Sequence, residues 1–313
     1  MTEILTVTLN PALDLATSCP SVSPGPKLRC GPETAEPGGG GVNVARAVVQ
    51  LGGQARALVA LGGANGDALE RLLQERDLDL IRHEAPGQTR HSFSVTDEST
   101  GAQYRFVLSG PEWTETQLDA VLDRLAAEAG AGDYIVLSGS MPPGCAPGWI
   151  TRACDRLSGR RVVVDTSGAH LHHQATAPGP APFVLRMDSA EARDLSGLGL
   201  ETRADSAAFA ETLRARGAAE IVIIARGKDG SVMATDKGRW HVTAANETVV
   251  SAIGAGDSFV GGFVKALAEG LDHPEALRHG AAAAAAAVIS PGTQLCLPGD
   301  FADALPRTDL IAL

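Results

Sequence analysis

The chain has 313 residues, 44% of them hydrophobic, and a formal net charge of −11 at pH 7. This length can bury one large core or two smaller ones. The net negative charge disfavours nucleic acids and anionic lipids, so we expect neither nucleic acid nor membrane as a partner. A phosphorylated small molecule is compatible with the charge, because a few local cations suffice to hold it.

The cysteines Cys19, Cys30, Cys145, Cys154 and Cys296 are scattered and form no CxxC pair. This spacing fits neither a disulfide framework nor a zinc site and is typical of reduced thiols. The N-terminus lacks the pattern of a signal peptide, and the longest apolar stretch, residues 281–289, is too short to cross a bilayer. We therefore expect a cytoplasmic protein.

Strand-like and helix-like segments alternate along most of the chain. Residues 3–9 and 55–61 are typical of buried strands, whereas 42–51 and 66–78 have helical spacing. The rhythm continues with helical patterns at 114–130, 147–159, 205–218 and 274–289 and strand patterns at 133–140, 161–168 and 220–227. This alternation predicts an α/β body in which helices cover both faces of a mostly parallel central sheet.

Two segments interrupt the rhythm. Residues 89–108 alternate polar and apolar side chains on either side of the turn at 97–101, which predicts a hairpin, and residues 12–36 are rich in proline. Together they predict a small antiparallel sheet that is discontinuous in sequence. The expected units are a body of residues 1–11, 37–88 and 110–313 and a sheet unit of residues 12–36 and 89–109.

The stretch SAIGAGDSFVGGF, residues 251–263, places glycines and Asp257 at the start of a predicted helix. Free N–H groups of Gly254, Ala255 and Gly256 would form an anion site there, and Asp257 could accept the proton of an attacking hydroxyl. The alternative is a helix-capping aspartate with glycines that allow close packing. Taken alone, the stretch does not decide between them.

A second cluster, Gly38 to Gly41, precedes the predicted helix that carries Asn43. Four glycines exceed what a tight turn needs, which favours a site where the backbone approaches a ligand. Basic residues occur in the interrupting segments: Lys27 and Arg29 lie two apart, and Arg90 and Arg105 flank the hairpin. Arginines that converge on a pocket would bind the phosphate of a sugar phosphate.

The combination of TLNPALD (8–14), PGGGGVNVARA (37–47) and GAGDSFVGGF (254–263) resembles the ribokinase-like sugar kinases of the phosphofructokinase B type, from Thr6 to Cys296. Within that family the chain is most similar to the minor bacterial 6-phosphofructokinases, in GPKLRC, PGTQLC and Gly40. The resemblance implies a three-layer ribokinase-like body, a β-sheet lid used for homodimerisation, and transfer of the ATP γ-phosphoryl group with Mg²⁺. The substrate would be fructose 6-phosphate, phosphorylated at its C1 hydroxyl.

The resemblance also implies roles for individual residues. Asp257 would be the base and residues 254–256 the anion hole. The sugar phosphate would contact Asp14, Lys27, Arg29, Gly38, Gly39, Gly40, Asn43, Arg90, Arg105 and Ser140. The nucleotide would contact Arg186, Asp188, Ala225, Gly227, Gly230, Ala281 and Ala285. Glu191 and Asp188 would order the water around Mg²⁺, and K⁺ would bind at Ser251, Ile253, Ala287, Ser290 and Gly292.

Two departures from the family pattern concern the nucleotide side. Where relatives have Lys-Pro-Asn, this chain has Arg186-Met187-Asp188, with Glu191 retained, and Ala225 replaces a common hydroxyl. Asp188 adds negative charge beside the triphosphate, which a metal or Arg186 must offset. The alternatives are a kinase for tagatose 6-phosphate or fructose 1-phosphate, and a sugar-phosphate sensor without turnover.

Overall fold

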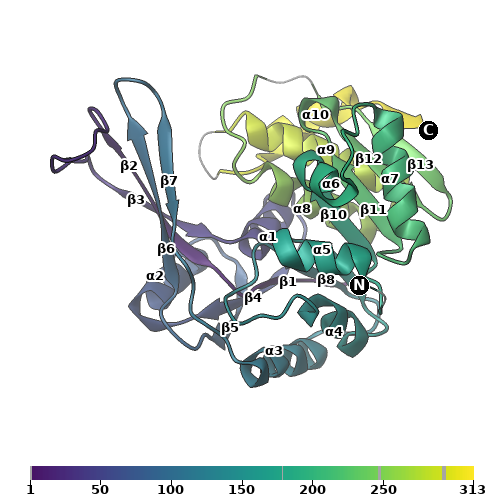
Figure 1. The fold of residues 1–313 in the computed structure, drawn as a ribbon, viewed down its shortest axis with the longest axis horizontal. Helices are drawn as coiled ribbons and strands as arrows, with labels where there is room; N and C mark the ends of the chain where they lie inside the picture. The colour runs from purple at the N-terminus through teal and green to yellow at the C-terminus, as the bar shows by residue number, and fades with distance from the viewer. Residues whose placement is uncertain (1, 178, 246–247, 291–293) are drawn as a thin grey trace.

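The computed structural model describes every residue except 1, 178, 246–247 and 291–293 (Figure 1). Its described part contains a ten-stranded sheet in the order β14-β13-β12-β11-β10-β9-β8-β1-β4-β5. The seven strands from β5 to β11 in this order pair in parallel, and β12, β13 and β14 continue the sheet in antiparallel. The strands are β1 (Ile4–Thr8), β4 (Arg56–Leu61), β5 (Asp79–Glu84), β8 (Tyr134–Ser138), β9 (Arg161–Asp165), β10 (Val184–Asp188), β11 (Ile221–Ala225), β12 (Ser231–Thr235), β13 (Gly238–Val242) and β14 (Leu310–Ala312).

Helices cover both faces of this sheet, because successive strand residues point to opposite sides. On β8, for example, Ile135 and Leu137 join one core cluster, whereas Tyr134 and Val136 join the other. The first cluster contains residues of α3 (Glu115–Glu128), α4 (Trp149–Arg156), α5 (Gly168–Thr176), α6 (Ser189–Ser196) and α7 (Arg203–Ala215). The second contains residues of α1 (Gly40–Gln50), α2 (Gly63–Gln74), α8 (Ala255–Ala268) and α9 (His273–Val288), and α10 (Pro298–Ala304) packs on α9. The predicted three-layer α/β body is confirmed.

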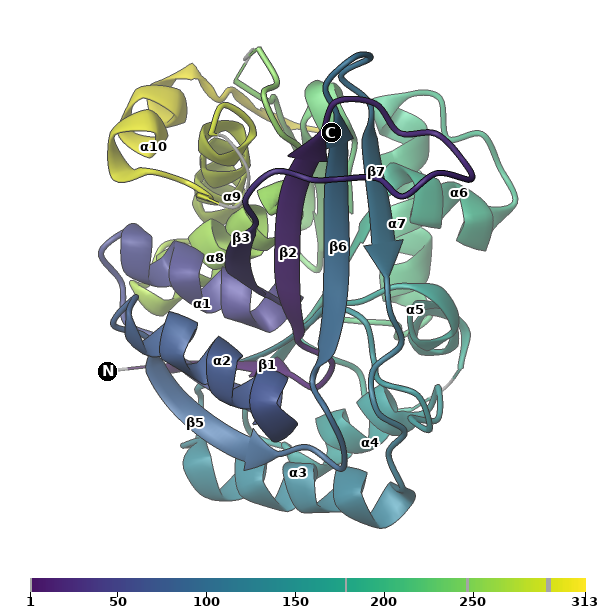
Figure 2. The ribbon, with the colours of Figure 1, turned by 90° about the vertical axis from the view of Figure 1, so that its left-hand side faces the viewer.

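The lid is a separate four-stranded sheet in the order β3-β2-β6-β7 (Figure 2). Its strands are β2 (Ala12–Cys19), β3 (Thr34–Gly38), β6 (Arg90–Asp97) and β7 (Gln103–Val107). The expected hairpin is present as the antiparallel pair β6–β7. The expectation of a purely antiparallel sheet is wrong, because β2 and β6 pair in parallel. Each of these two strands follows a body strand, β1 or β5, so both leave the body in the same direction.

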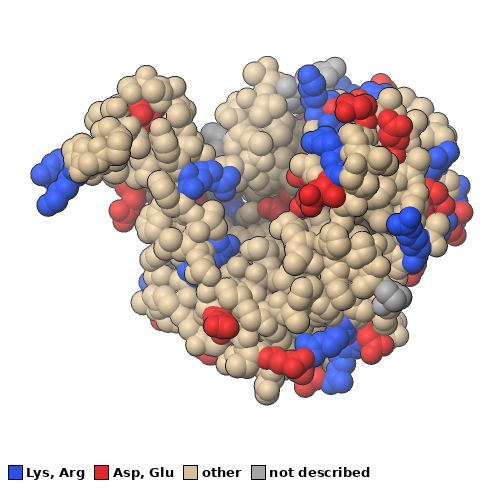
Figure 3. Space-filling view, viewed as in Figure 1, with Lys and Arg blue, Asp and Glu red and all other residues tan. Residues whose placement is uncertain are grey.

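The lid stands beyond the carboxyl ends of β1 and β5, where α1 and α8 begin. Figure 3 shows a cleft between lid and body, with acidic and basic side chains at its floor. The lid strands occupy residues 12–38 and 90–107, and the division of the chain into two units stays a prediction. Within the described residues, no helix combines the length and the apolar character needed to span a membrane.

Candidate active site

Helix α8 begins where the chain turns through a glycine. Gly254 is its N-cap with φ 73°, a backbone conformation that favours glycine, and a Cβ there would lie 2.4 Å from Cδ2 of Leu295. Asp257 therefore lies in the first turn of α8. The apolar side chains of this helix, which include Phe259 and Phe263, are buried in the core.

Three segments far apart in the sequence meet at the Asp257 carboxylate. Asn43, from the first turns of α1, donates its Nδ2 hydrogen to Asp257 Oδ2 at 2.9 Å. Ser138, the last residue of β8, donates from Oγ to Oδ1 at 3.4 Å. Burial, and to a lesser extent the charge of Asp165, raise the pKa of Asp257 to about 7 against the opposing effects of Asn43, Arg186 and Ser138. A carboxylate with this pKa is well matched to accept a proton near neutral pH.

A largely buried ion pair lies beside the same helix turn. Arg186 Nη1 donates to Asp165 Oδ1 at 2.8 Å, and the two side chains are 13% and 12% exposed. The guanidinium carbon lies 5.7 Å from the ring centroid of Phe259. A Cβ at Gly256 would lie 3.1 Å from Arg186 Nη1, so the missing side chain leaves room for the guanidinium beside Gly256.

The residues Gly38 to Gly41 pack tightly against neighbouring segments. A Cβ on Gly38 would lie 2.2 Å from Asp14 Oδ2, and one on Gly40 would lie 2.5 Å from Ser138 Oγ. Gly39 is the N-cap of α1 with φ 135°. These glycines therefore bring the start of α1 against Asp14 and the end of β8, so close packing is one of their roles.

Asp14 and two lid arginines lie together. Burial raises the pKa of Asp14, while a hydrogen bond from Ser92 and the charges of Arg90 and Arg105 oppose the shift. Arg90 donates from Nε and Nη2 to the carbonyl oxygen of Asn10, at 3.2 and 3.1 Å. The structure thus brings Asp14, Arg90 and Arg105 to one region, and Ser140 is nearby because its Oγ accepts from Asn10 Nδ2 at 3.2 Å.

Lys27 and Arg29 are placed differently. Both lie on the exposed loop between β2 and β3, which Figures 1 and 2 show at the end of the lid that points away from the body. The described structure records no contact between either side chain and Asp14 or Asp257. Their role toward a sugar phosphate stays a prediction.

A cavity of about 440 Å³ opens next to α8, between the loops after β11 and the side of α9. Six of the seven residues expected at a nucleotide line it: Arg186, Ala225, Gly227, Gly230, Ala281 and Ala285. Asp188 does not. Sequence reasoning missed Lys228, Ser231, Ala244 and Val249, which also line the cavity. Ser231 begins β12, the other three lie outside the strands and α-helices, and none belongs to a motif.

Asp188 and Glu191 form the capping box of α6. Asp188 Oδ1 accepts from the backbone N–H groups of Ala190 and Glu191, at 2.7 and 2.9 Å, and Glu191 Oε2 accepts from the N–H of Asp188 at 2.8 Å. Burial raises the pKa of Glu191. The helix cap thus occupies one oxygen of each carboxylate, and no group of three metal-binding side chains occurs in the part of the chain that the structure describes.

The two loops expected to hold K⁺ lie side by side. The N–H groups of Val250 and Ser251 donate to the carbonyl oxygen of Val288, at 2.7 and 3.0 Å. Ile253 donates its N–H to Ser251 Oγ at 3.2 Å, and Ser290 is buried. Gly292, the remaining expected ligand besides Ala287, lies outside the described residues.

The profile of the pfkB family carbohydrate kinases matches residues 8–300. The chain belongs to this family. It is similar to the ATP-dependent 6-phosphofructokinase isozyme 2 of Mycobacterium tuberculosis, 38% identical over 296 residues that cover 94% of this chain and 86% of that protein. It also resembles a 1-phosphofructokinase of Xanthomonas campestris, 32% identical over 268 residues that cover 85% and 84% of the two chains.

Solved structures agree with this assignment. Phosphofructokinase-2 from Escherichia coli in complex with potassium superimposes with a TM-score of 0.91 at 34% identity, covering 98% of this chain and 99% of the other. The same E. coli enzyme in complex with fructose-6-phosphate gives 0.89 at 33% identity, with the same coverage. The family's ribokinase-like fold and its kinase class are therefore those of this chain.

Proposed function

We propose that this kinase transfers the γ-phosphoryl group of ATP to the C1 hydroxyl of fructose 6-phosphate, giving fructose 1,6-bisphosphate and ADP. The observation that carries the proposal is the Asp257 carboxylate. It lies in the first turn of α8, receives a hydrogen bond from Asn43 at 2.9 Å, and has a pKa of about 7. The relatives named 6-phosphofructokinase support the choice of substrate.

In this proposal Asp257 accepts the proton of the C1 hydroxyl while the hydroxyl oxygen attacks the γ-phosphorus. The bond from that phosphorus to the β,γ-bridging oxygen breaks, and ADP leaves with the electron pair. The N–H groups of Gly254 and Gly256 would face the transferring group, where preset donors stabilise the charge that develops. The N–H of Ala255, also expected to be free, instead donates to the carbonyl oxygen of Ala252 at 3.4 Å. Proton transfer to a positioned base contributes roughly 10²- to 10⁴-fold.

The cavity beside α8 fits the nucleotide. Its small side chains, among them Ala281 and Ala285 on α9, leave room for a flat base. Arg186 faces the turn at Gly256, and its Nε has no hydrogen-bond partner in the described structure, so a phosphate oxygen could accept from it. Mg²⁺ would neutralise charge on the transferring phosphoryl group. Asp188 and Glu191 each keep a carboxylate oxygen free of the cap, with which they could order its water.

On the sugar side, Asp14 and Asn43 would accept and donate hydrogen bonds to hydroxyls, and Arg90 and Arg105 would pair with the 6-phosphate. Lys27 and Arg29 add positive charge on the lid. Closure of the lid over the cleft would exclude water that could otherwise hydrolyse ATP. The proposal thus assigns one substrate to each side of Asp257.

The test is ADP release with fructose 6-phosphate, fructose 1-phosphate and tagatose 6-phosphate, comparing kcat/KM for the three substrates. We expect fructose 6-phosphate to give the highest value and Asp257→Asn to lower kcat by 10² or more with KM little changed. Asp155→Asn, an exposed aspartate on α4, is the matched control and should keep full activity. Binding of fructose 6-phosphate without turnover by the unaltered chain would identify a sensor instead.

We also propose that the chain forms a homodimer through the lid. Every residue of the edge strand β7 is exposed. Phe106 on β7, Phe93 on the neighbouring strand β6 and Leu108 directly after β7 form exposed apolar surface, at 54%, 37% and 47%. An unpaired edge strand with apolar side chains is a ready surface for a second sheet. Phe106→Glu should give a monomer in sedimentation velocity, whereas Leu198→Glu, at a body residue that is 63% exposed, should not.

For the monovalent cation, we propose K⁺ at the paired loops around Ser251 and Ser290. The hydrogen bonds from 250 and 251 to Val288 hold these loops together, and the E. coli relative has been solved in complex with potassium. Replacing K⁺ by tetramethylammonium should lower kcat. Activity that does not depend on K⁺ would remove this site from the proposal.

A further inference from the structure

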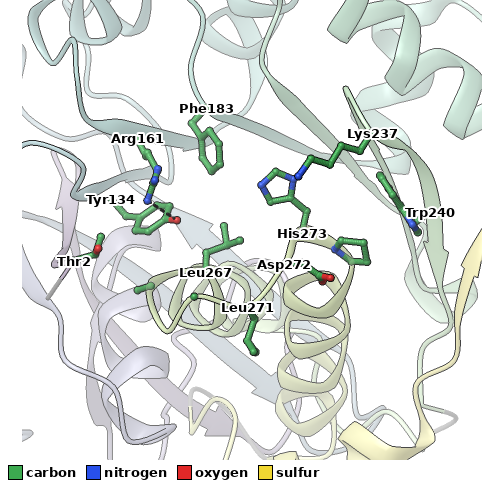
Figure 4. Close-up of a pocket in the computed structure, with 13 residues that line it drawn as sticks. Thr2, Tyr134, Arg161, Phe183, Lys237, Trp240, Leu267, Leu271, Asp272 and His273 are labelled. Carbon is green, nitrogen blue, oxygen red and sulfur yellow. Dashed lines mark hydrogen bonds between the residues drawn. The ribbon is translucent and has the colours of Figure 1, made fainter.

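A second cavity, of about 590 Å³, lies at the end of the central sheet opposite to the one that carries Asp257 (Figure 4). Tyr134 and Arg161 begin β8 and β9, and Phe183 directly precedes β10, so the cavity is at the amino ends of the parallel strands. Leu267 brings the last turn of α8 to it. Ten residues of helix, about 15 Å, separate Leu267 from Asp257. This cavity is therefore distinct from the sugar and nucleotide sites.

Two cations face the cavity without an acidic partner. Arg161 Nη1 donates to the Tyr134 hydroxyl at 3.1 Å, and its guanidinium carbon lies 5.1 Å from the Tyr134 ring centroid and 5.9 Å from that of Phe183. Figure 4 shows Lys237 extending toward His273 from the other side. Neither Arg161 nor Lys237 forms an ion pair with any residue that the structure describes. Unpaired cations on aromatic walls are a favourable place for an anion.

The other charges around the cavity do not cancel these two. Burial lowers the pKa of His273, and Lys237 and Arg161 lower it further against Asp236 and Asp272, so its ring is neutral at neutral pH. Asp272 also lines the cavity, but its Oδ1 caps α9 by accepting from the N–H of Glu275 at 2.9 Å. Two cations and one carboxylate among the lining residues leave the cavity with one net positive charge.

The remaining walls suit a flat apolar group. The rings of Phe183 and His273 meet edge to face, with centroids 5.9 Å apart and an interplanar angle of 67°. Trp240, Leu267 and Leu271 complete an apolar lining. Pockets of this size hold small organic molecules, and ring contacts of this kind contribute beyond the area that they bury.

We propose that this cavity binds a small organic anion that carries a flat ring. Its phosphate or carboxylate pairs with Arg161 and Lys237, and its ring packs on Phe183, His273 and Trp240. Such a ligand contacts the end of α8 whose other end carries the catalytic base. It takes no part in phosphoryl transfer, which occurs at the carboxyl ends of the parallel strands.

The test is calorimetric titration of the full-length enzyme with phenyl phosphate and with benzoate, which separates phosphate from carboxylate recognition. Inorganic phosphate supplies the charge without the ring, and benzyl alcohol supplies the ring without the charge. We expect at least one of the first two to bind, and inorganic phosphate and benzyl alcohol to bind at least tenfold more weakly. Trp240 should report binding by fluorescence, because Trp113 and Trp149 are buried elsewhere in the core.

Variants locate the binding site. Arg161→Met and Lys237→Met should each raise Kd about tenfold, the loss of one charge-assisted contact. Arg161→Lys should restore part of the affinity, and Arg193→Met, an exposed arginine on α6, should leave Kd unchanged. If Arg161→Met does not fold, the exposed Lys237 still provides the test. The proposal is overturned if neither ring anion binds, if benzyl alcohol or inorganic phosphate binds equally well, or if both methionine variants keep the original Kd.

Discussion

The raised pKa of Asp257 makes a prediction about stability as well as catalysis. Its pKa is about 7 in the folded chain, against a model-compound value of 3.8. The folded state holds the proton of Asp257 more tightly than the unfolded state, so protonation stabilises the fold. This contribution to the free energy of unfolding is fully present below pH 3.8. It is lost as the pH rises through 7. At pH 8 the enzyme carries a destabilising charge that Asp257→Asn removes.

The size of the effect follows from the shift in pKa. A difference of about 3 units at 1.36 kcal/mol each gives about 4 kcal/mol at pH 8. At pH 5 the advantage of the amide falls to about 2 kcal/mol, because the folded carboxyl is then largely protonated. With an unfolding entropy of about 2.1 cal/mol/K per residue, 4 kcal/mol corresponds to a rise in Tm of roughly 6 °C for this chain length.

The assay is thermal unfolding of the two ligand-free proteins at pH 5 and pH 8, followed by circular dichroism. Asp97→Asn is a control of opposite sign. Hydrogen bonds from Ser99, Val22 and Thr100 hold the pKa of Asp97 at about 2, so its amide variant should lose stability at pH 8. The reasoning fails if Asp257→Asn has the same Tm as the unaltered enzyme at pH 8, or if its gain is equal at both pH values.

The remaining predictions concern the surroundings of this carboxylate. Arg46 Nη1 donates to Asn43 Oδ1 at 3.2 Å and so orients the amide toward Asp257. Arg46→Met should therefore move the rise of kcat/KM with pH to higher pH. An unchanged pH profile of kcat/KM would contradict this role. Gly40→Ala should lower kcat/KM more than tenfold, because the new Cβ would lie 2.6 Å from the backbone N of Gly139. An unchanged kcat/KM would show that the chain around Gly40 or Gly139 can shift to make room. Asp188→Asn should change the Mg²⁺ dependence of turnover, and an identical Mg²⁺ titration would remove Asp188 from the surroundings of the metal.

The sequence predicted the body well, because its strands are continuous apolar runs and its helices have a clear stripe. The sequence also identified Asp257, because the glycines of its turn and the carboxylate are neighbours in the sequence and can be read as one motif. Asp165 was missed, although it lies beside Arg186 in the register of β9 and β10. A single aspartate at the end of a strand carries no signal until the order of the strands is known.

Other features depend on tertiary pairing in the same way. Strand β5 (Asp79–Glu84) is an edge strand with few buried residues and was not recognised from its pattern. The capping box of Asp188 and Glu191 satisfies the helix end, a role that competes with the metal role suggested by their spacing. The pattern of residues in a segment shows which of its side chains are buried. The parallel pairing of β2 with β6 depends instead on the direction in which each strand leaves the body.

That pairing has a consequence for how the molecule assembles. The centre of the lid is the pairing of β2 with β6, which belong to two segments of the chain that leave the body separately. Neither segment can complete the four-stranded sheet until the other lies beside it. Contacts between residues so distant along the chain form slowly, because closing long loops costs entropy before it brings any gain. We infer that the lid is the last part to order during folding, so the enzyme gains its cover only once the catalytic floor is in place.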